Sequence, residues 1–147
     1  MGHSVTTMAV WNKYKEVSKS LFNNYIIFFT ILELFQGVLV VGYGSGHIRL
    51  FSLSTGHIMC EISAHNGWIT GMDLASHSGL LLSCAEDSYV RVWQLNTKGP
   101  LVEHWFSSPI HDCLMTGAKF LDPRGSSFCI ASYDSSSIQV TDPSLPK

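Results

Sequence analysis

A repeat in the second half of the sequence constrains the fold more than any other feature. Three stretches share one pattern: an apolar run, a small polar turn, and a run in which apolar and polar residues alternate. They are LVVGYGSGHIRLFSL at 39–53, LLSCAEDSYVRVWQL at 81–95 and FCIASYDSSSIQVTD at 128–142. Strict alternation is typical of a strand with one buried face, and Gly, Asp and Ser favour tight hairpin turns. Each stretch therefore predicts a strand, a turn and a second strand.

The segments upstream of these hairpins also repeat. HNGWITGMDL at 65–74 aligns with HDCLMTGAKF at 111–120, and the histidine, threonine and glycine fall at identical offsets. Corresponding positions of neighbouring units lie 42 to 46 residues apart. A period of about 40–45 residues with several strands in each unit is typical of the blades of a β-propeller.

The second unit resembles a WD repeat. Ala64-His65 stands where that family usually has Gly-His. Trp93-Gln94 stands where the family usually has Trp-Asp, with Gln94 in the place of the aspartate. The resemblance implies an all-β fold, an incomplete WD-repeat propeller with about three blades of antiparallel sheet.

The resemblance also implies a structural set of hydrogen-bonded side chains in this unit. The set comprises His65, Ser83, Asp87 and Trp93. The indole N–H of Trp93 is expected to bond Ser83, Ser83 to bond His65, and His65 to bond Asp87. A buried indole N–H needs an acceptor, and a buried carboxylate is costly unless it is paired. The set is therefore expected to stabilise the blade.

A His-Ser-Asp combination also raises the alternative of a catalytic triad. Ser83, however, lies inside an apolar run, and no G-x-S-x-G motif surrounds it. We therefore favour the structural role and expect no catalytic residue.

Only the second unit has the full set. The first unit lacks the serine, the aspartate and the tryptophan. The third unit keeps His111 and Asp134 but has Ala131 in the serine place and Thr141 in the tryptophan place.

The repeats divide the chain into five parts. These are the first strand of an interrupted blade at 1–16, a hydrophobic insertion at 17–36, the remainder of the first blade at 37–63, the second blade at 64–110 and a third, C-terminal blade at 111–147. A short helix within the insertion is an alternative that the sequence leaves open.

The insertion follows from a difference in spacing. Residues 5–10 parallel residues 69–74, which predicts that they form the innermost strand of the first blade. The tryptophan place lies 48 residues after His3 but only 28 after His65, an excess of 20. Residues 17–36, VSKSLFNNYIIFFTILELFQ, account for that excess.

A retained intron would explain this segment. Val17-Ser18 and Phe35-Gln36 have codons that match the usual ends of an intron, and an apolar run just before the end is what a pyrimidine-rich tract encodes. A genuine long loop or a hydrophobic docking helix is the alternative. On the first interpretation the chain is a truncated or splice-variant form of a longer propeller.

A membrane role for the same segment is a second alternative. The apolar run at 25–32 has eight residues, whereas a spanning helix needs about 20. Glu33 and Gln36 follow it, and no signal-peptide cleavage site is evident. A membrane-associated adaptor anchored through 21–36 therefore stays as the alternative to a cytoplasmic protein.

Composition narrows the functional classes. The formal net charge is −2 and the pI is about 6.3, which gives no basic surface for nucleic acid. The four cysteines include no C-x-x-C pair, so we expect free thiols in a reducing compartment and no metal or cofactor.

Charged residues are only 14% of the chain, against about 25% in typical domains. Three units cannot close a ring of about 4–8 blades, so we expect exposed blade edges and self-association through them.

These features favour a non-enzymatic scaffold that binds other proteins, with a propeller hydrolase as a less favoured alternative. The resemblance implies docking residues at the start of the innermost strands and beside the hairpin turns. They are Asn66, Trp68 and Glu86 in the second blade, and Asp112, Leu114 and Tyr133 in the third. The alternative is that Trp68 belongs to the core and that Glu86 is merely solvated.

Overall fold

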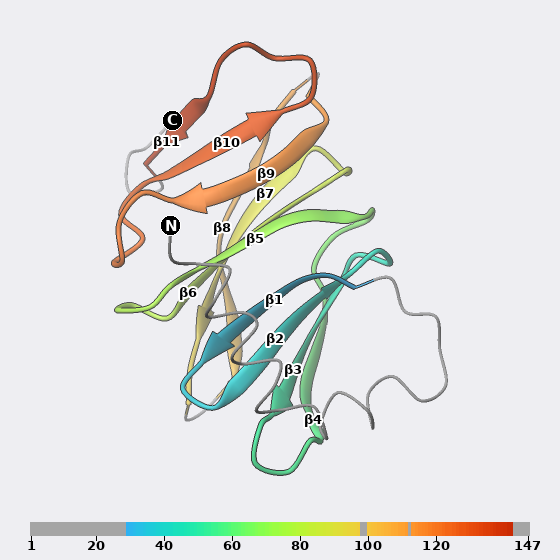
Figure 1. Cartoon of the computed structure of the whole chain (residues 1–147), viewed down its shortest axis with the longest axis vertical. Helices are drawn as coiled ribbons and strands as arrows, with labels where there is room; N and C mark the ends of the chain where they lie inside the picture. Colours follow the sequence, from blue (N-terminus) through green and yellow to red (C-terminus); the bar gives the residue numbers. More distant parts are fainter. Residues whose placement is uncertain (1–28, 98–99, 112, 143–147) are drawn as a thin grey trace, which may run out of the picture.

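The computed structural model describes residues 29–97, 100–111 and 113–142, which form eleven β-strands in three antiparallel sheets (Figure 1). We call these sheets the first, second and third blades. The all-β fold and the three blades predicted from the repeats are confirmed.

The first and second blades have four strands each, paired in chain order. The strands of the first are β1 (Phe29–Phe35), β2 (Val38–Tyr43), β3 (His47–Ser52) and β4 (Ile58–Ser63). Those of the second are β5 (Ile69–Ala75), β6 (Leu80–Ala85), β7 (Tyr89–Leu95) and β8 (Val102–Pro109). The third blade has three described strands in the same arrangement, β9 (Met115–Phe120), β10 (Phe128–Ser132) and β11 (Gln139–Thr141).

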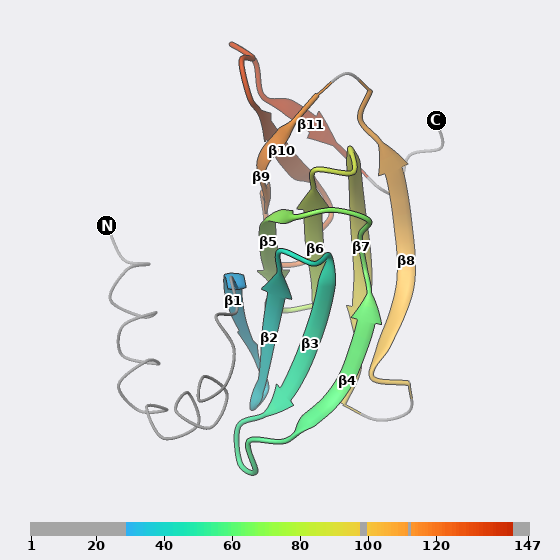
Figure 2. The ribbon, with the colours of Figure 1, turned by 90° about the vertical axis from the view of Figure 1, so that its right-hand side faces the viewer.

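The blades stack face to face, with the first strand of each on a common side. Figure 2 shows β1, β5 and β9 along one side and the outer strands β4 and β8 along the other. Strand β5 contacts both β1 and β9. The second blade is therefore the only one of the three with a described neighbour on both faces.

Burial of β6 reflects this central position. All six of its residues, LLLSCA, are buried, as expected for a near-continuous apolar run covered on both sides. One face of the second blade packs on the first blade in a cluster with Leu81, Ala85 and Trp93. The other packs on the third blade in a cluster with Leu82, Val92 and Phe128.

Two contacts bring the second and third blades close together. A Cβ atom at Gly71 would lie 2.8 Å from the Ala118 nitrogen and 2.9 Å from the Gly117 Cα, so only glycine allows the two inner strands to approach this closely. The Asp73 carboxylate accepts a hydrogen bond from the Phe120 N–H at 2.7 Å and one from the Lys119 Nζ at 3.0 Å.

The first blade differs from the sequence-based expectation at its inner strand. Residues 5–10, which were expected there, lie outside the described residues. In the structure Phe29–Phe35 pairs with β2, in one register from Phe35 opposite Val38 to Ile31 opposite Gly42, and the register shifts between Ile31 and Phe29. The Phe35 side chain is buried between the first and second blades.

The described end of the hydrophobic insertion is therefore a strand, so the alternative of a short helix is wrong for residues 29–35. Backbone pairing with β2 satisfies the N–H and C=O groups that a helix would satisfy internally. Residues 17–28 lie outside the described part. In the part of the chain that the structure describes, there is no helix with the length and apolar character that a bilayer crossing requires.

Candidate functional site

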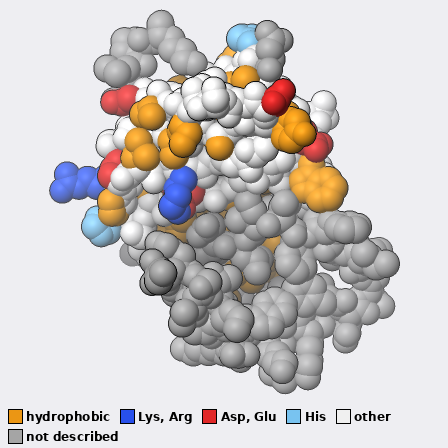
Figure 3. All heavy atoms as spheres, turned by 45° about the horizontal axis from the view of Figure 1, so that its top comes forward, with side chains coloured by type: hydrophobic (Ala, Val, Ile, Leu, Met, Phe, Trp, Pro, Cys, Tyr) orange, Lys and Arg blue, Asp and Glu red, His pale blue; other side chains and the backbone are white. Residues whose placement is uncertain are grey.

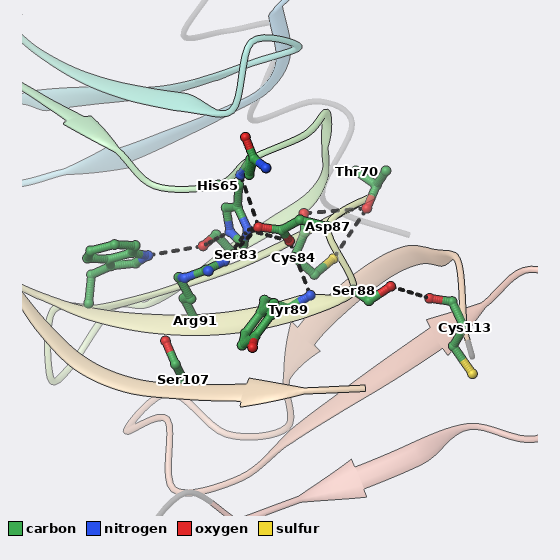
Figure 4. Close-up of polar contacts among 12 residues, drawn as sticks. His65, Thr70, Ser83, Cys84, Asp87, Ser88, Tyr89, Arg91, Ser107 and Cys113 are labelled. Atoms are coloured by element: carbon green, nitrogen blue, oxygen red, sulfur yellow. Dashed lines mark hydrogen bonds and ion pairs between the residues drawn. The ribbon is translucent and has the colours of Figure 1, made fainter. Parts of the chain in front are cut away.

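The predicted hydrogen-bonded set is assembled at one end of the second blade (Figure 4). His65 lies in the segment that joins the first blade to β5, Ser83 in β6, and Trp93 in β7. Asp87 lies in the tight turn between β6 and β7. Four separate segments thus place their side chains at one point.

Short distances connect the members of the set. The Trp93 Nε1 lies 3.0 Å from the Ser83 Oγ, and that Oγ lies 2.8 Å from the His65 Nε2. The His65 Nδ1 lies 3.0 Å from an oxygen of Asp87. The contacts implied by the resemblance are all present.

The chemistry of the donors fixes the direction of each bond. The indole N–H can only donate and the Asp87 carboxylate can only accept, so the Ser83 oxygen accepts from Trp93 and the His65 Nδ1–H donates to Asp87. In a neutral His65 ring the Nε2 is then an acceptor, and the Ser83 hydroxyl donates to it.

The Asp87 carboxylate also accepts hydrogen bonds from the surrounding backbone. It accepts the Asn66 N–H at 3.0 Å and the Tyr89 N–H at 3.1 Å. These bonds tie the segment before β5 to the turn before β7. The carboxylate thus fixes the geometry of two loops as well as the His65 ring.

Arg91 is a member of this set that the sequence analysis missed. Its Nη1 donates to an Asp87 oxygen at 3.0 Å, and its guanidinium lies over the Tyr89 ring, 4.6 Å from the centroid. The same Nη1 is 2.7 Å from the His65 Nδ1, but both atoms are donors here, so that contact is no hydrogen bond. The sequence does contain a signal for this arginine. An arginine stands two residues before the aromatic residue in both blades, as Arg91 before Trp93 and Arg49 before Phe51.

The pKa shifts agree with these protonation states. Burial lowers the pKa of His65 from its ordinary 6.5, and the positive charge of Arg91 lowers it further. The Asp87 carboxylate raises this pKa but does not outweigh burial. Burial would raise the pKa of Asp87, but hydrogen bonds from the Asn66 N–H and from His65 outweigh it and lower the pKa. A neutral imidazole beside a carboxylate is thus the stable state near neutral pH.

The Ser83 hydroxyl of this set is enclosed by the described residues. Ser83 is fully buried, and its oxygen already accepts the indole hydrogen of Trp93. A nucleophile must reach the reacting carbon, which this hydroxyl cannot do without opening the blade. Within the described residues there is also no group of three or more His, Cys, Asp or Glu that could hold a metal ion.

The third blade does not assemble an equivalent set. His111 and Asp134 are both exposed, and no hydrogen bond joins them among the described residues. The register also corrects one assignment: Ile130, opposite Ala118 in β9, takes the place that Ser83 takes opposite Met72 in β5. Ala131 is therefore one residue beyond the serine place.

Five of the six predicted docking residues lie in the described part of the chain, and all five are exposed. The exposed fraction is 39% for Trp68, 48% for Leu114 and 71% for Tyr133. Asn66 and Glu86 are exposed beside the Asp87 turn. Asp112 lies outside the described residues.

Backbone bonds bring these residues together in pairs at equivalent places. The Glu86 N–H donates to the Trp68 carbonyl at 2.9 Å, and the Tyr133 N–H donates to the Leu114 carbonyl at 2.7 Å. The Trp68 ring also lies against Gly44 of the first blade, where an added Cβ would come within 3.3 Å of it. Trp68 therefore combines a partly exposed ring with packing between blades.

Two further exposed apolar side chains lie in the third blade. Ile138 is in the loop between β10 and β11 that also carries Tyr133, and Val140 is in β11; both are mostly exposed. Figure 3, which brings the end with the third blade forward, shows hydrophobic side chains scattered among polar ones, with few charged ones.

Comparisons with known proteins agree with this architecture. The sequence profile of a family described as WDR54 matches residues 5–142. The chain is 45% identical over 107 residues to WD repeat-containing protein 54 of Mus musculus, covering 70% of this chain and 32% of that protein. It is 37% identical over 112 residues to WD repeat-containing protein 54 of Homo sapiens, covering 74% and 34% respectively. The chain thus spans about a third of the length of the curated relatives it matches.

Solved structures show the same fold at low identity. The β-propeller domain of Myceliophteria_thermophila Cps50 (Swd1) superposes with a TM-score of 0.69 at 18% identity, over 80% of this chain and 36% of that one. The computationally designed Ika4 protein superposes with a TM-score of 0.63 at 19% identity, over 78% and 65%. With three antiparallel sheets that resemble propeller blades, and with the family profile matched almost end to end, the chain belongs to the WDR54 family of WD-repeat proteins.

Proposed function

We propose that this chain is a non-enzymatic scaffold that binds other proteins through the loop ends of its second and third blades. The observation that carries the proposal is the repeated pair of exposed residues, Trp68 with Glu86 and Leu114 with Tyr133, each joined by one backbone hydrogen bond. Aromatic side chains that are partly exposed on a rigid frame are the residues that most often anchor protein interfaces.

The rigidity of the frame supports this role. The Asp87 carboxylate holds the backbone of Asn66 and of Tyr89, so the loop that carries Trp68 is ordered before a partner arrives. Preorganised loops lose less conformational entropy on binding. The structural set and the docking surface are therefore coupled in our proposal.

Proximity labelling in cells tests the proposal directly. The Tyr133→Ala and Trp68→Ala variants should each lose labelling of the partners that the parent chain labels. Trp105→Ala is the matched control, because Trp105 is 54% exposed but lies on the outer strand β8. An unchanged partner set in both loop variants, or equal losses in the Trp105 control, would contradict the proposal.

We place the chain in the cytoplasm as part of the same proposal. The structure shows Cys60, Cys84, Cys113 and Cys129 as free thiols, which suits a reducing compartment. The membrane-adaptor alternative requires residues 21–36 to enter a bilayer, whereas residues 29–35 pair with β2. Carbonate extraction of the expressed chain separates the two.

Self-association through blade edges is a further part of the proposal. Strand β11 is the last described strand of its sheet, and it carries the exposed Val140. A sheet edge that has no partner strand among the described residues can pair with another chain. Sedimentation at increasing protein concentration should show a rising mass, and a Val140→Lys variant should reduce it.

A further inference from the structure

The segment that joins the first and second blades contains an Asn-Gly pair, Asn66-Gly67. We propose that Asn66 is a site of spontaneous deamidation, which converts its amide to a carboxylate next to Asp87. The inference does not depend on the proposed scaffold function.

The reaction needs only water. The Gly67 backbone nitrogen loses its proton to solvent base and attacks the side-chain carbonyl carbon of Asn66. A C–N bond forms in a cyclic imide while the C–N bond to the side-chain amide breaks, and ammonia leaves with a proton from solvent. Water then opens the imide at either carbonyl, so residue 66 becomes aspartate or isoaspartate.

Several features of the structure favour this attack at Asn66. The residue is exposed, and among the described residues no hydrogen bond engages its side-chain amide. Gly67 lies in a bend, before the ladder between β5 and β6 begins at Ile69, so no ladder bond holds its N–H. Glycine also has no Cβ to obstruct the approach and accepts a wide range of backbone angles.

Asn96 provides an internal contrast. It is half-buried, and its Nδ2 donates to the Pro100 carbonyl at 3.1 Å. Its own N–H donates to the Leu101 carbonyl at 3.0 Å. The residue after it is Thr97, whose β-branched side chain restricts the backbone and crowds the attacking nitrogen.

The product would disturb the centre of the second blade. The N–H of residue 66 donates to Asp87 at 3.0 Å, so the new negative charge is carried by the residue whose backbone binds this carboxylate. Like charges on neighbouring residues repel each other. Isoaspartate also adds a methylene to the main chain between this N–H and Gly67, which changes how the loop meets the Asp87 turn.

Peptide mapping by mass spectrometry tests the inference on the full chain. The folded protein is incubated at mildly alkaline and at mildly acidic pH, and conversion is measured at Asn66 and at Asn96. We expect several-fold more conversion at Asn66, faster at the alkaline pH, with part of the product accepted by an isoaspartyl methyltransferase.

Two variants act as controls. Asn66→Gln keeps an amide but forms the cyclic imide much more slowly, so methyltransferase labelling should be lost. Gly67→Ala should slow conversion as well, because a Cβ next to the attacking nitrogen obstructs its approach. That Cβ would lie 3.3 Å from the Asp87 nitrogen, so the loop needs only a small shift to accommodate it. Conversion at Asn66 no faster than at Asn96, or conversion seen only after unfolding in urea, would overturn the inference.

Discussion

The second and third blades have equivalent backbone hydrogen bonds, but their side chains make different contacts. In both, a backbone bond links the start of the inner strand to the hairpin turn, from Glu86 to Trp68 and from Tyr133 to Leu114. His65 is buried and bonded on both ring nitrogens, whereas His111 is exposed. The motif residues thus act as a set only where Ser83 is present.

Burial from both sides explains the contrast. The second blade lies between two others, and its outer strand β8 covers β7. The third blade has a described neighbour on one face, and β11 has only three described residues, none of them buried. A side-chain network gains strength from a low-dielectric setting, which the second blade provides and the third does not.

The comparison is tested most strongly at the two aspartates. Asp87→Ala should destabilise the fold by about 2–4 kcal/mol, because it leaves the buried His65 ring and two backbone N–H groups without their acceptor. Asp134→Asn should change stability by no more than about 0.5 kcal/mol, because the site is exposed and asparagine tolerates the left-handed backbone there, with φ at 56°. Urea unfolding followed by tryptophan fluorescence measures both. Equal effects at the two positions would break the comparison.

Two serines offer a sharper test. Ser83→Ala should cost about 1–3 kcal/mol, since it leaves the Trp93 N–H and the His65 Nε2 without a partner. Ser132 has a buried hydroxyl with no hydrogen-bond partner among the described residues, so Ser132→Ala should be neutral or slightly stabilising. Thermal melts of the two variants against the parent chain decide this. A loss at Ser132 as large as that at Ser83 would contradict it.

The pH dependence of stability should come from the second blade. His65 has a lowered pKa when folded, so the unfolded chain binds a proton first as the pH falls below about 6.5, and stability decreases by at most about 1.4 kcal/mol per pH unit from this group. Asp87, whose pKa is also lowered, adds a second loss below about pH 4.

A histidine variant locates the first loss. His65→Gln should flatten the stability profile between neutral pH and the range where carboxylates protonate, although its overall stability falls. A variant profile as steep as that of the parent over this range would place the titrating group elsewhere.

The smallest expected difference concerns the thiols. Burial raises the pKa of Cys84 to about 11, with a hydrogen bond from Thr70 acting in the opposite direction. Only the thiolate reacts readily, so Cys84 should stay unmodified by an alkylating reagent at neutral pH while Cys129 of the third blade, which is only half-buried, is labelled. Mass spectrometry before and after denaturation reads this out. Early labelling of Cys84 would show that the second blade opens.

Much of the second blade could be predicted from the sequence, because its residues carry both the alternation of a strand and the polar set. The third blade was less predictable. Ser83 and Trp93 are ten positions apart, but Ile130 and Thr141 are eleven apart, so counting back from Thr141 gives Ala131. One extra residue between the paired strands changes which side chain faces the core.

The inner strand of the first blade shows a second limit of the sequence. Backbone bonds to β2 are available to any extended segment, and a spacing argument favours residues 5–10 without excluding an apolar segment nearer in the chain. The retained-intron hypothesis for 17–36 stays a prediction. Sequencing the transcript across codons 16 to 37 tests it, and an uninterrupted genomic exon without a spliced form would contradict it.

The bond from Asp73 to the Phe120 N–H has a consequence for how the chain comes apart. In stacked repeats the stability of each unit depends on its contacts with its neighbours. Because this carboxylate and the close contact at Gly71 span the boundary between two blades, we expect those blades to melt in a single cooperative transition. The third blade, which we expect to be the less stable of the two, then stays folded through its contacts with the second blade.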